Sequence, residues 1–328
     1  IPGFSSMIEA SFAIIIGLVL LTFGADRFVD SAAAAANNLG ISPLLVGLII
    51  VGFATSAPEM LVAGVASLNG NPSLAVGNAI GSNIANIGLV IGVTALVMPL
   101  TVNSRVLLRE FPIMFACIGL AWMLCWDGFL SFSDGVVLLV GLIVMLAITA
   151  WLGVHDQSDD SLGKEMKERL AHNMSNARAA TWLIIGLCML LVGSKALVDG
   201  AVTIATHFGV SDLVIGLTIV AIGTSLPELA ASVASALKGQ PDIALGNVIG
   251  SNMFNVLGVI SVPGLLHPSA LDAEVLTRDF PVMVGLSVVL LGVAVGWRRN
   301  GRINRIEGGG LLLAFGAYQS LLFFTSAS

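Results

Sequence analysis

Charge is scarce in this chain. Only 10% of its 328 residues are Asp, Glu, Lys or Arg, whereas a soluble domain carries about 25%. The 14 basic residues are fewer than the 20 acidic ones, so we expect no nucleic-acid partner, which would call for a basic surface. The scarcity of charge excludes an ordinary soluble domain.

Histidine and cysteine are also few. The chain has four histidines and three cysteines, and the histidines fall in expected loops or at the ends of apolar segments. Their placement argues against a buried metal-hydrolase centre built on imidazole. Cys117, Cys125 and Cys188 lie in or near apolar segments without metal-like spacing, so we expect small core residues and no disulfide framework.

Hydrophobic residues take the place of the missing charge. They make up 56% of the chain, and the mean hydropathy is +0.98. A transmembrane helix needs about 20 apolar residues, and the 37 glycines suit tightly packed membrane helices. We therefore predict an all-α protein whose main partner is the lipid bilayer, with ten transmembrane helices at 7–36, 43–68, 73–99, 105–125, 131–153, 179–206, 212–237, 242–266, 275–297 and 306–325.

A block of polar residues occurs twice. The run ATSAPE at 54–59 returns as GTSLPE at 223–228, and GNAIGSN at 77–83 returns as GNVIGSN at 246–252. The offset between the copies is the same in both cases, and 15 of 35 aligned positions around the blocks are identical. Most of these positions hold polar residues, Gly or Pro, which hydrophobic composition alone would not match. Such a duplication in an apolar chain predicts a site at the interface of two repeats.

The repeat divides the chain into two halves. We expect five helices over 1–154, a hydrophilic linker over 155–178, and five helices over 179–328. Because each half has an odd number of spans, the second half enters the membrane from the opposite side, so the repeats are predicted to be inverted. Lys and Arg favour the cytoplasmic side, which predicts both termini outside, the linker in the cytoplasm, and a prokaryotic plasma (inner) membrane.

Glu59 and Glu228 lie in the middle of the expected second and seventh spans. A carboxylate at the bilayer centre costs about 2.5–3.5 kcal/mol on insertion scales, so it usually faces a cavity and marks function. A lone buried glutamate could be a protonated structural residue, but two at equivalent positions favour a site.

Pro58 and Pro227 come directly before the two glutamates. A proline inside a helix lacks the N–H and clashes with the preceding turn, so we expect both helices to break. Unwound backbone is tolerated at membrane depth where it is buried or lines a cavity. The freed carbonyls, including those of Gly52 and Ala221, are candidate cation ligands.

Hydroxyl and amide oxygens accompany each glutamate at helical spacing. The candidates are Thr55, Ser56, Thr224 and Ser225 on the glutamate spans, and Ser82, Asn86, Ser251 and Asn255 on the spans that follow. Hydroxyls in membrane helices also commonly bond to their own backbone, but the duplication favours ligands. We expect a supporting shell that bonds to the broken backbone, formed by Asn78, Asn83, Asn247 and Asn252.

This candidate site contains only oxygen ligands. Ca²⁺ takes six to eight oxygens, and the carboxylates of Glu59 and Glu228 would balance its charge. Neither a thiolate nor an imidazole is available to favour Zn²⁺ or Cu. The two glutamates are thus the predicted metal ligands, and hard cations the predicted ligand class.

The doubled Thr-Ser-x-Pro-Glu and Gly-Asn-x-Ile-Gly-Ser-Asn blocks resemble the two alpha-repeats of the calcium/cation antiporter superfamily, which includes the sodium/calcium exchangers. The resemblance covers both halves and nearly the whole chain. It implies ten helices in two inverted five-helix repeats with broken helices at mid-membrane, and alternating-access exchange of Ca²⁺ for Na⁺. It further implies that Glu59 and Glu228 hold Ca²⁺ and compete for Na⁺, that the hydroxyl and Asn candidates complete the sites, and that the first and sixth helices slide against the rest.

One departure from the family pattern concerns Asn86 and Asn255. Some members carry Asp at one of these positions, so this site has two carboxylates rather than three. The departure leaves the coupling ratio, electrogenicity and K⁺ dependence open.

We therefore predict a secondary active antiporter that exchanges Ca²⁺ for Na⁺, is not an enzyme, and has no cofactor beyond the transported ions. The alternatives are H⁺ in place of Na⁺, a K⁺-dependent exchange, another divalent cation, and a passive cation channel. An intramembrane enzyme is disfavoured because no Ser/Lys or Ser/His pair falls at membrane depth. The sequence gives no oligomerisation signal.

Overall fold

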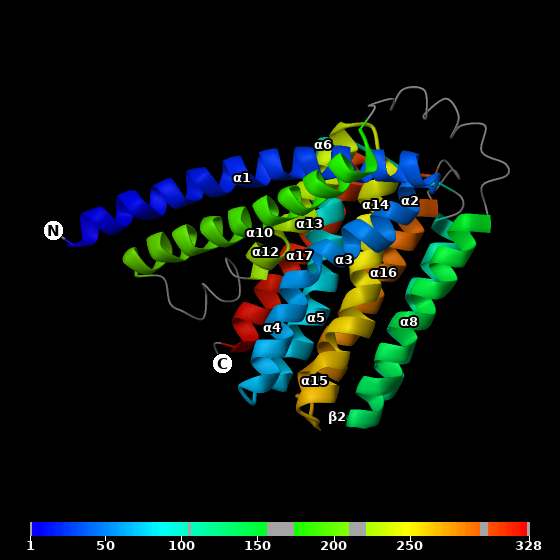
Figure 1. Ribbon diagram of the computed structural model, residues 1–328. Helices are drawn as coiled ribbons and strands as arrows, with labels where there is room; N and C mark the ends of the chain where they lie inside the picture. The colour runs from blue at the N-terminus through cyan, green and yellow to red at the C-terminus, as the bar shows by residue number, and fades with distance from the viewer. Residues whose placement is uncertain (1, 104–105, 156–173, 210–220, 296–300, 327–328) are drawn as a thin grey trace.

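The computed structural model describes residues 2–103, 106–155, 174–209, 221–295 and 301–326 (Figure 1). Within these ranges nine helices are long and apolar enough to cross a membrane, and they coincide with nine of the ten predicted spans. The tenth, 212–237, lies partly outside the described residues, and its described part forms α12 (Ala221–Thr224) and α13 (Leu226–Leu237). The predicted linker over 155–178 lies largely outside them as well. The described part of the chain is that of an all-helical integral membrane protein apart from four short strands.

The first half contains helices of both α and π type, the latter labelled η. They are α1 (Pro2–Leu39), α2 (Pro43–Leu45), η1 (Val46–Val51), α3 (Gly52–Thr55), α4 (Ala57–Leu68), α5 (Pro72–Ala85), η2 (Asn86–Ile91), α6 (Gly92–Val97), η3 (Val106–Glu110), α7 (Phe111–Leu124) and α8 (Phe132–His155), with strands β1 (Leu100–Thr101) and β2 (Phe129–Leu130).

The second half follows the same plan. Besides α12 and α13 it contains α10 (Asn176–His207), α14 (Pro241–Phe254), η5 (Asn255–Val259), α15 (Ser261–Leu266), η6 (Val275–Asp279), α16 (Phe280–Val295) and α17 (Arg305–Ser326), with strands β3 (Ser269–Ala270) and β4 (Arg302–Ile303). The offset of the sequence repeat carries the bounds of α4 and α5 onto those of α13 and α14, and the bounds of η3 onto those of η6. The π-helical segments were not predicted from the sequence.

Proline sets where the repeated helices begin. Pro72 opens α5 and Pro241 opens α14, at the first helical position, where the missing N–H would have no helical partner anyway. The Asn71 side chain caps α5 by accepting a hydrogen bond from Leu74 N at 3.3 Å. These local signals explain why the two central helices begin at equivalent positions.

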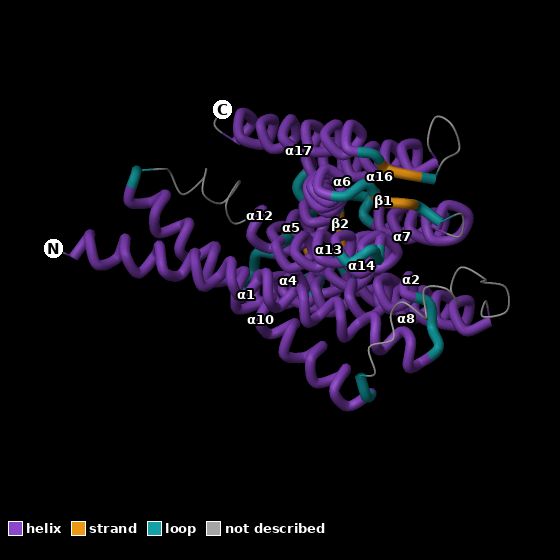
Figure 2. Tube along the Cα trace, turned by 90° about the horizontal axis from the view of Figure 1, so that it is seen from above, coloured by secondary structure: helices purple, strands orange, loops and turns teal. Residues whose placement is uncertain are grey.

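The long helices α1 and α10 lie side by side and run obliquely across a bundle of more upright helices (Figure 1), of which the inner ones, such as α5 and α14, are seen closer to end-on in Figure 2. Glycine permits their close approach: a Cβ at Gly17 would meet the Gly193 carbonyl oxygen at 2.7 Å. The two backbones therefore touch directly, the packing that small residues allow between membrane helices.

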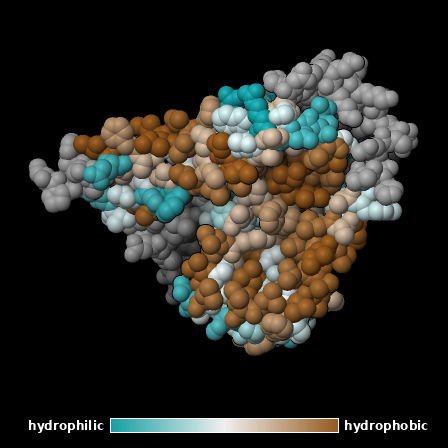
Figure 3. Space-filling model, viewed as in Figure 1, coloured by the Kyte–Doolittle hydropathy of each residue, from teal (hydrophilic) through white to brown (hydrophobic). Residues whose placement is uncertain are grey.

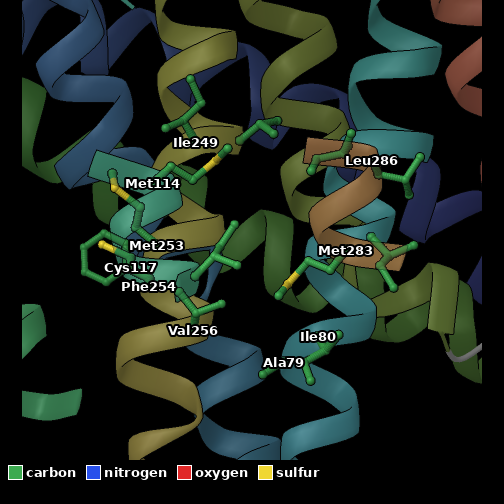
Figure 4. Close-up of a cluster of buried hydrophobic side chains, with 14 of the residues drawn as sticks. Ala79, Ile80, Met114, Cys117, Ile249, Met253, Phe254, Val256, Met283 and Leu286 are labelled. Carbon is green, nitrogen blue, oxygen red and sulfur yellow. The ribbon is translucent and has the colours of Figure 1, made fainter. Parts of the chain in front are cut away.

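The core of the bundle surrounds α14. Every residue of this helix is buried except its first two, Pro241 and Asp242, which is typical of a helix enclosed on all sides. Figure 4 shows side chains from α5, α7, α14 and α16 meeting in this core, among them Ile80, Met114, Met253 and Met283. Apolar side chains also cover most of the visible outer face (Figure 3), as expected for a surface in contact with lipid.

The four short strands join the two halves. The strand β1 pairs with β4, with Leu100 opposite Ile303, and β2 pairs with β3, with Phe129 opposite Ala270. The end of α6 is thereby fixed beside the connection from α16 to α17, and the connection from α7 to α8 beside the end of α15. Strands this short carry no periodic signal, so the sequence could not reveal these pairs.

The cysteines differ from one another in burial. Cys117 and Cys125 are buried free thiols, as predicted, but Cys188 is exposed, so the prediction of a core residue was wrong there. Cys188 lies on α10, one of the two long helices that cross the outside of the bundle. A helix in that place buries only part of its surface, so an apolar residue on it need not belong to the core.

Candidate cation-binding site

Both glutamates follow a break in a helix. The break between α3 and α4 lies at Ser56, with φ −81° and ψ 2°, and that between α12 and α13 lies at Ser225, with φ −90° and ψ 5°. Pro58 and Pro227 then occupy the second position of the new helix, where their missing N–H is harmless. The repeated Ser-x-Pro sequence therefore places the same backbone turn twice.

Glu59 and Glu228 stand in the first turn of α4 and α13. Free N–H groups there stabilise negative charge. Each residue is only 1% exposed, and each is in electrostatic contact with a hydroxyl, Glu59 with that of Ser82 and Glu228 with that of Thr55. The carboxyl groups of Glu59 and Glu228 lie close enough to interact. The two breaks thus bring two carboxyl groups into one buried region.

The carboxylate oxygens lack ordinary partners. Among the described residues none of the four carboxylate oxygens of Glu59 and Glu228 accepts a hydrogen bond of standard geometry, although all four are buried. The hydroxyl oxygens of Ser56 and Ser225, in the turns of the two breaks, are buried and without a partner in the same part of the chain. Buried polar groups are normally paired, so this cluster calls for a ligand.

Asn86 and Asn255 are held by asparagines of the opposite half. Asn86 Nδ2 donates to Asn252 Oδ1 at 3.1 Å, and Asn255 Nδ2 donates to Asn83 Oδ1 at 3.1 Å. Since each amide nitrogen is used in this way, the oxygen of the same amide points elsewhere, and both oxygens are buried without a partner among the described residues. Each bond thereby leaves one acceptor free to join the unpaired cluster.

The supporting asparagines only partly behave as expected. Asn247 Nδ2 does bond to the backbone beside a break, donating to the Glu228 carbonyl oxygen at 3.2 Å. Asn83 Nδ2 instead donates to the carbonyl oxygen of Asn252 on α14 at 3.1 Å, and Asn252 accepts from Asn86. The expectation of bonds to the broken backbone was wrong for these two, because α5 and α14 pack against each other. Asn78 is half-buried, and its Nδ2 has no acceptor among the described residues.

Thr55 and Ser251 connect the first break to the second half. Thr55 Oγ1 lies 3.1 Å from Asn247 Oδ1 and 3.3 Å from Ser251 Oγ. It also lies 3.1 Å from the carbonyl oxygen of Val51, four residues earlier in the chain. Ser251 Oγ donates to the Gly52 carbonyl oxygen at 3.3 Å, and Ser56 N donates to it at 3.1 Å. The Gly52 carbonyl is therefore occupied by protein donors, and as a cation ligand it would have to exchange them.

The second break has a contact that the sequence did not suggest. Ser194 on α10 is buried and donates to the Gly223 carbonyl oxygen at 2.7 Å. A single serine within an apolar run carries no motif, so no sequence signal could have found it. Of the predicted residues in this region, Thr224 is half-buried and Ala221 begins α12.

Some charged residues outside the cluster form ion pairs with one another. Lys238 Nζ lies 2.7 Å from Asp26 Oδ1 and 2.5 Å from Asp30 Oδ1, which ties α13 to α1. Lys195 and Asp199 form an exposed pair within α10 at 2.9 Å. No set of three or more His, Cys, Asp or Glu side chains in the described ranges is placed to hold a metal. A cation at the unpaired cluster would therefore rest on two carboxylates and neutral oxygens.

Comparison with known proteins shows the family of this chain. The sequence profile of the family described as "Sodium/calcium exchanger protein" matches residues 10–151 and 178–324. The chain belongs to this family. It is 47% identical to "Putative antiporter CaxA" of Alkalimonas amylolytica, over 97% of this chain and 99% of that protein, and 40% identical to "Inner membrane protein YrbG" of Escherichia coli K12, over 98% of each.

Solved structures of the sodium-calcium exchanger NCX_Mj are also similar. The form soaked with 10 mM Na⁺ and zero Ca²⁺ superposes with a TM-score of 0.82 at 33% identity, over 96% of this chain and 99% of that chain. Members of the exchanger family are transporters rather than enzymes, so this chain is a membrane antiporter-family protein that acts on cations.

Proposed function

We propose that this protein is a secondary active antiporter that exchanges Ca²⁺ for Na⁺ at one shared site between its halves. The observation that carries the proposal is the cluster of unpaired buried oxygens, from the carboxylates of Glu59 and Glu228, the amide oxygens of Asn86 and Asn255, and the hydroxyls of Ser56 and Ser225. Buried oxygens without hydrogen-bond partners are costly in a dry interior, and a bound cation would remove that cost.

The ligand chemistry favours hard cations. Six to eight oxygens suit Ca²⁺, and two carboxylates balance its charge. Two Na⁺ ions would neutralise the two carboxylates equally well. The ligand set we propose is Glu59, Glu228, Ser56, Ser225, Asn86 and Asn255, with contributions from Thr55, Thr224, Ser82, Ser251 and the carbonyls of Gly52 and Ala221. Because Ca²⁺ and Na⁺ need the same carboxylates, binding of one displaces the other, which is the basis of exchange rather than leak.

The two breaks supply the geometry of alternating access. We propose five helices in each half, over 1–154 and 179–328, joined by the linker 155–178 and related by inversion. The strand pairs support this arrangement. In the sequence repeat β3 is the counterpart of β1, and β4 is the counterpart of β2. The pairs cross over, however, because β1 pairs with β4 and β2 pairs with β3. In repeats of the same orientation, those partners would lie at opposite ends of the bundle.

The moving layer we propose consists of α1 and α10. Their backbones touch at Gly17 and Gly193, so they form one unit, and Ser194 links that unit to the second break. Motion of the pair would therefore act on the backbone next to Glu228.

We place the protein in the plasma membrane of a prokaryote, with both termini outside and the linker in the cytoplasm. The distribution of Lys and Arg supports this orientation, and a relative 40% identical over 98% of this chain is named an inner membrane protein.

The test is Ca²⁺ uptake into proteoliposomes loaded with Na⁺, for the unmodified protein and for Glu59→Gln and Glu228→Gln. Uptake that depends on the outward Na⁺ gradient, with a loss of about 100-fold in each variant, is the expected result, because truncating one charge of a buried cation contact costs about 2–5 kcal/mol. Ca²⁺ uptake that is driven by a pH gradient without Na⁺ would show that H⁺ is the counter-ion. Uptake that occurs only with K⁺ would show a K⁺-dependent exchange. Uptake that runs without any counter-ion would overturn the antiporter in favour of a channel.

A further inference from the structure

The asparagine that supports Glu228 is fully anchored. Asn247 Nδ2 donates to the Glu228 carbonyl oxygen at 3.2 Å and to Ser232 Oγ at 2.9 Å, and Asn247 Oδ1 accepts from Thr55 Oγ1 at 3.1 Å. A primary amide has two N–H donors, and both are used here. Ser232, Asn247 and Thr55 are all buried at 0–1% exposure. The orientation of this side chain is therefore fixed by bonds to helices of both halves.

The equivalent asparagine in the first half lacks such an anchor. At the offset of the sequence repeat, Asn78 is the counterpart of Asn247, and Ala63 is the counterpart of Ser232. The helices that carry them, α4 and α5, pack as α13 and α14 do. Where Ser232 offers a hydroxyl, Ala63 offers only a methyl group, and Asn78 Nδ2 is buried without an acceptor among the described residues. One serine thus distinguishes the two sides of the site.

We propose that Ser232 is a positioning residue for cation binding: it orients Asn247, which fixes the turn of Glu228 against Thr55, while Ala63 leaves the Glu59 side less constrained. This inference rests on the proposed function, since it concerns the same site. It makes the two glutamates unequal, with Glu228 as the rigid ligand and Glu59 as the adaptable one. Preorganised ligands bind a cation without first losing conformational freedom, so the rigid side sets the affinity.

The first experiment measures the initial rate of Na⁺-driven Ca²⁺ uptake in proteoliposomes as a function of Ca²⁺ concentration, for Ser232→Ala. We expect the half-saturating Ca²⁺ concentration to rise about tenfold, the usual effect of removing a residue that orients a metal ligand, with a change in maximal rate of less than about twofold. Ser232→Thr keeps the hydroxyl and should restore the affinity.

The matched control is Ser235→Ala. Ser235 is also buried on α13, but its hydroxyl donates to the Ala231 carbonyl oxygen of its own helix at 2.8 Å. This variant loses the same number of atoms without touching Asn247, so its half-saturating concentration should stay unchanged. Equal effects of the two alanine variants would overturn the proposal and reduce Ser232 to a packing residue.

A gain-of-contact variant keeps the test decisive if Ser232→Ala folds poorly. Ala63→Ser supplies the missing acceptor beside Asn78 and should lower the half-saturating Ca²⁺ concentration about threefold, in the direction opposite to Ser232→Ala. No change, or a rise, would contradict the proposal. Absence of exchange by the unmodified protein would instead refute the proposed function, and direct ⁴⁵Ca²⁺ binding to the purified variants would then still report whether Ser232 affects the site.

Discussion

From Ala57 to Glu110 the helices of the first half begin at the positions that the repeat offset assigns to those of the second half, from Leu226 to Asp279. The polar contacts of the two halves nevertheless differ. Asn247 has an anchor in Ser232 and Asn78 has none among the described residues. Likewise, Ser194 bonds to the second break, and its counterpart in the first half is Ala25. Duplication of the backbone has therefore not required duplication of the hydrogen bonds.

The difference shows which residues are kept at equivalent positions in both halves and which are not. The glutamates, the prolines before them and the Asn86 and Asn255 amides obey the repeat strictly, whereas the residues one layer further out do not. Under the inversion that we propose, the two halves face opposite sides of the membrane, so hydrogen bonds such as that of Ser232 can differ between the two sides of one site.

The largest effect we expect comes from adding a third carboxylate on the Asn86 side of the site. Asn86→Asp should lower the half-saturating Ca²⁺ concentration about 100-fold, because an added negative charge near a divalent cation is worth several kcal/mol even at an effective dielectric constant of about 20. Its partner Asn252 has a buried Nδ2 without an acceptor among the described residues. By turning its amide, Asn252 can donate to the new carboxylate.

Asn255→Asp should give a much smaller gain at neutral pH. Its partner Asn83 already uses Nδ2 on the Asn252 carbonyl oxygen, so it cannot turn without losing that bond. The carboxyl group introduced at position 255 would face Asn83 Oδ1 and can bond to it only when protonated, which adds no charge. Measuring Ca²⁺ dependence of uptake for both variants from about pH 6 to about pH 9 checks this. Equal gains at every pH would contradict it.

A smaller effect should follow from the carboxylates at the start of α7 and α16. Asp279 is buried, is bonded by Arg278 Nε at 2.6 Å, and accepts from Tyr318 OH at 3.0 Å. Its counterpart Glu110 is buried with an Oε2 that has no partner among the described residues. Tyr318→Phe should lower the free energy of unfolding by about 1.5 kcal/mol, the usual value of a hydrogen bond to a charged group.

Thermal unfolding in detergent measures the effect of Tyr318→Phe. When the first residue of α8, Phe132, is aligned with the first residue of α17, Arg305, Met145 becomes the counterpart of Tyr318. Met145→Leu loses only the contact of the Met145 sulfur with Thr149 Oγ1 at 3.7 Å, which is weaker than a bond to a carboxylate, so it serves as the control with a smaller expected change. If Tyr318→Phe destabilises equally in an Asp279→Ala background, the hydrogen bond is not the cause.

The sequence predicted the parts of the fold that depend on long apolar runs and on proline. Nine spans within the described ranges agree with the structure, and breaks occur near Pro58 and Pro227, because length, hydrophobicity and a missing N–H act locally. The π-helical segments, the strand pairs and the bond from Ser194 to Gly223 depend on packing between distant segments. No periodicity or motif in one stretch of sequence encodes such contacts.

For the candidate site, the repeat indicates residue types but not hydrogen-bond partners. Asn83 and Asn252 were predicted to bond to the broken backbone, but their bonds run across the halves to Asn255 and Asn86. A motif repeated within one chain indicates equivalence, whereas the partner of each side chain follows from how the halves interlock.

The smallest effect we expect separates two lysines of the second half, Lys195 within α10 and Lys238 at the end of α13. Lys238 bridges Asp26 and Asp30 of α1 with its side chain 22% exposed, while Lys195 pairs with Asp199 on the same helix with its side chain 77% exposed. Lys238→Ala should therefore cost about 1 kcal/mol of stability and Lys195→Ala less than about 0.5 kcal/mol, since exposed pairs are screened by water and salt. Thermal unfolding at low and high NaCl measures both, and the Lys238 effect should shrink less with salt. Equal losses would mean that the contacts of Lys238 with Asp26 and Asp30 stabilise the protein no more than the exposed pair of Lys195 and Asp199 does.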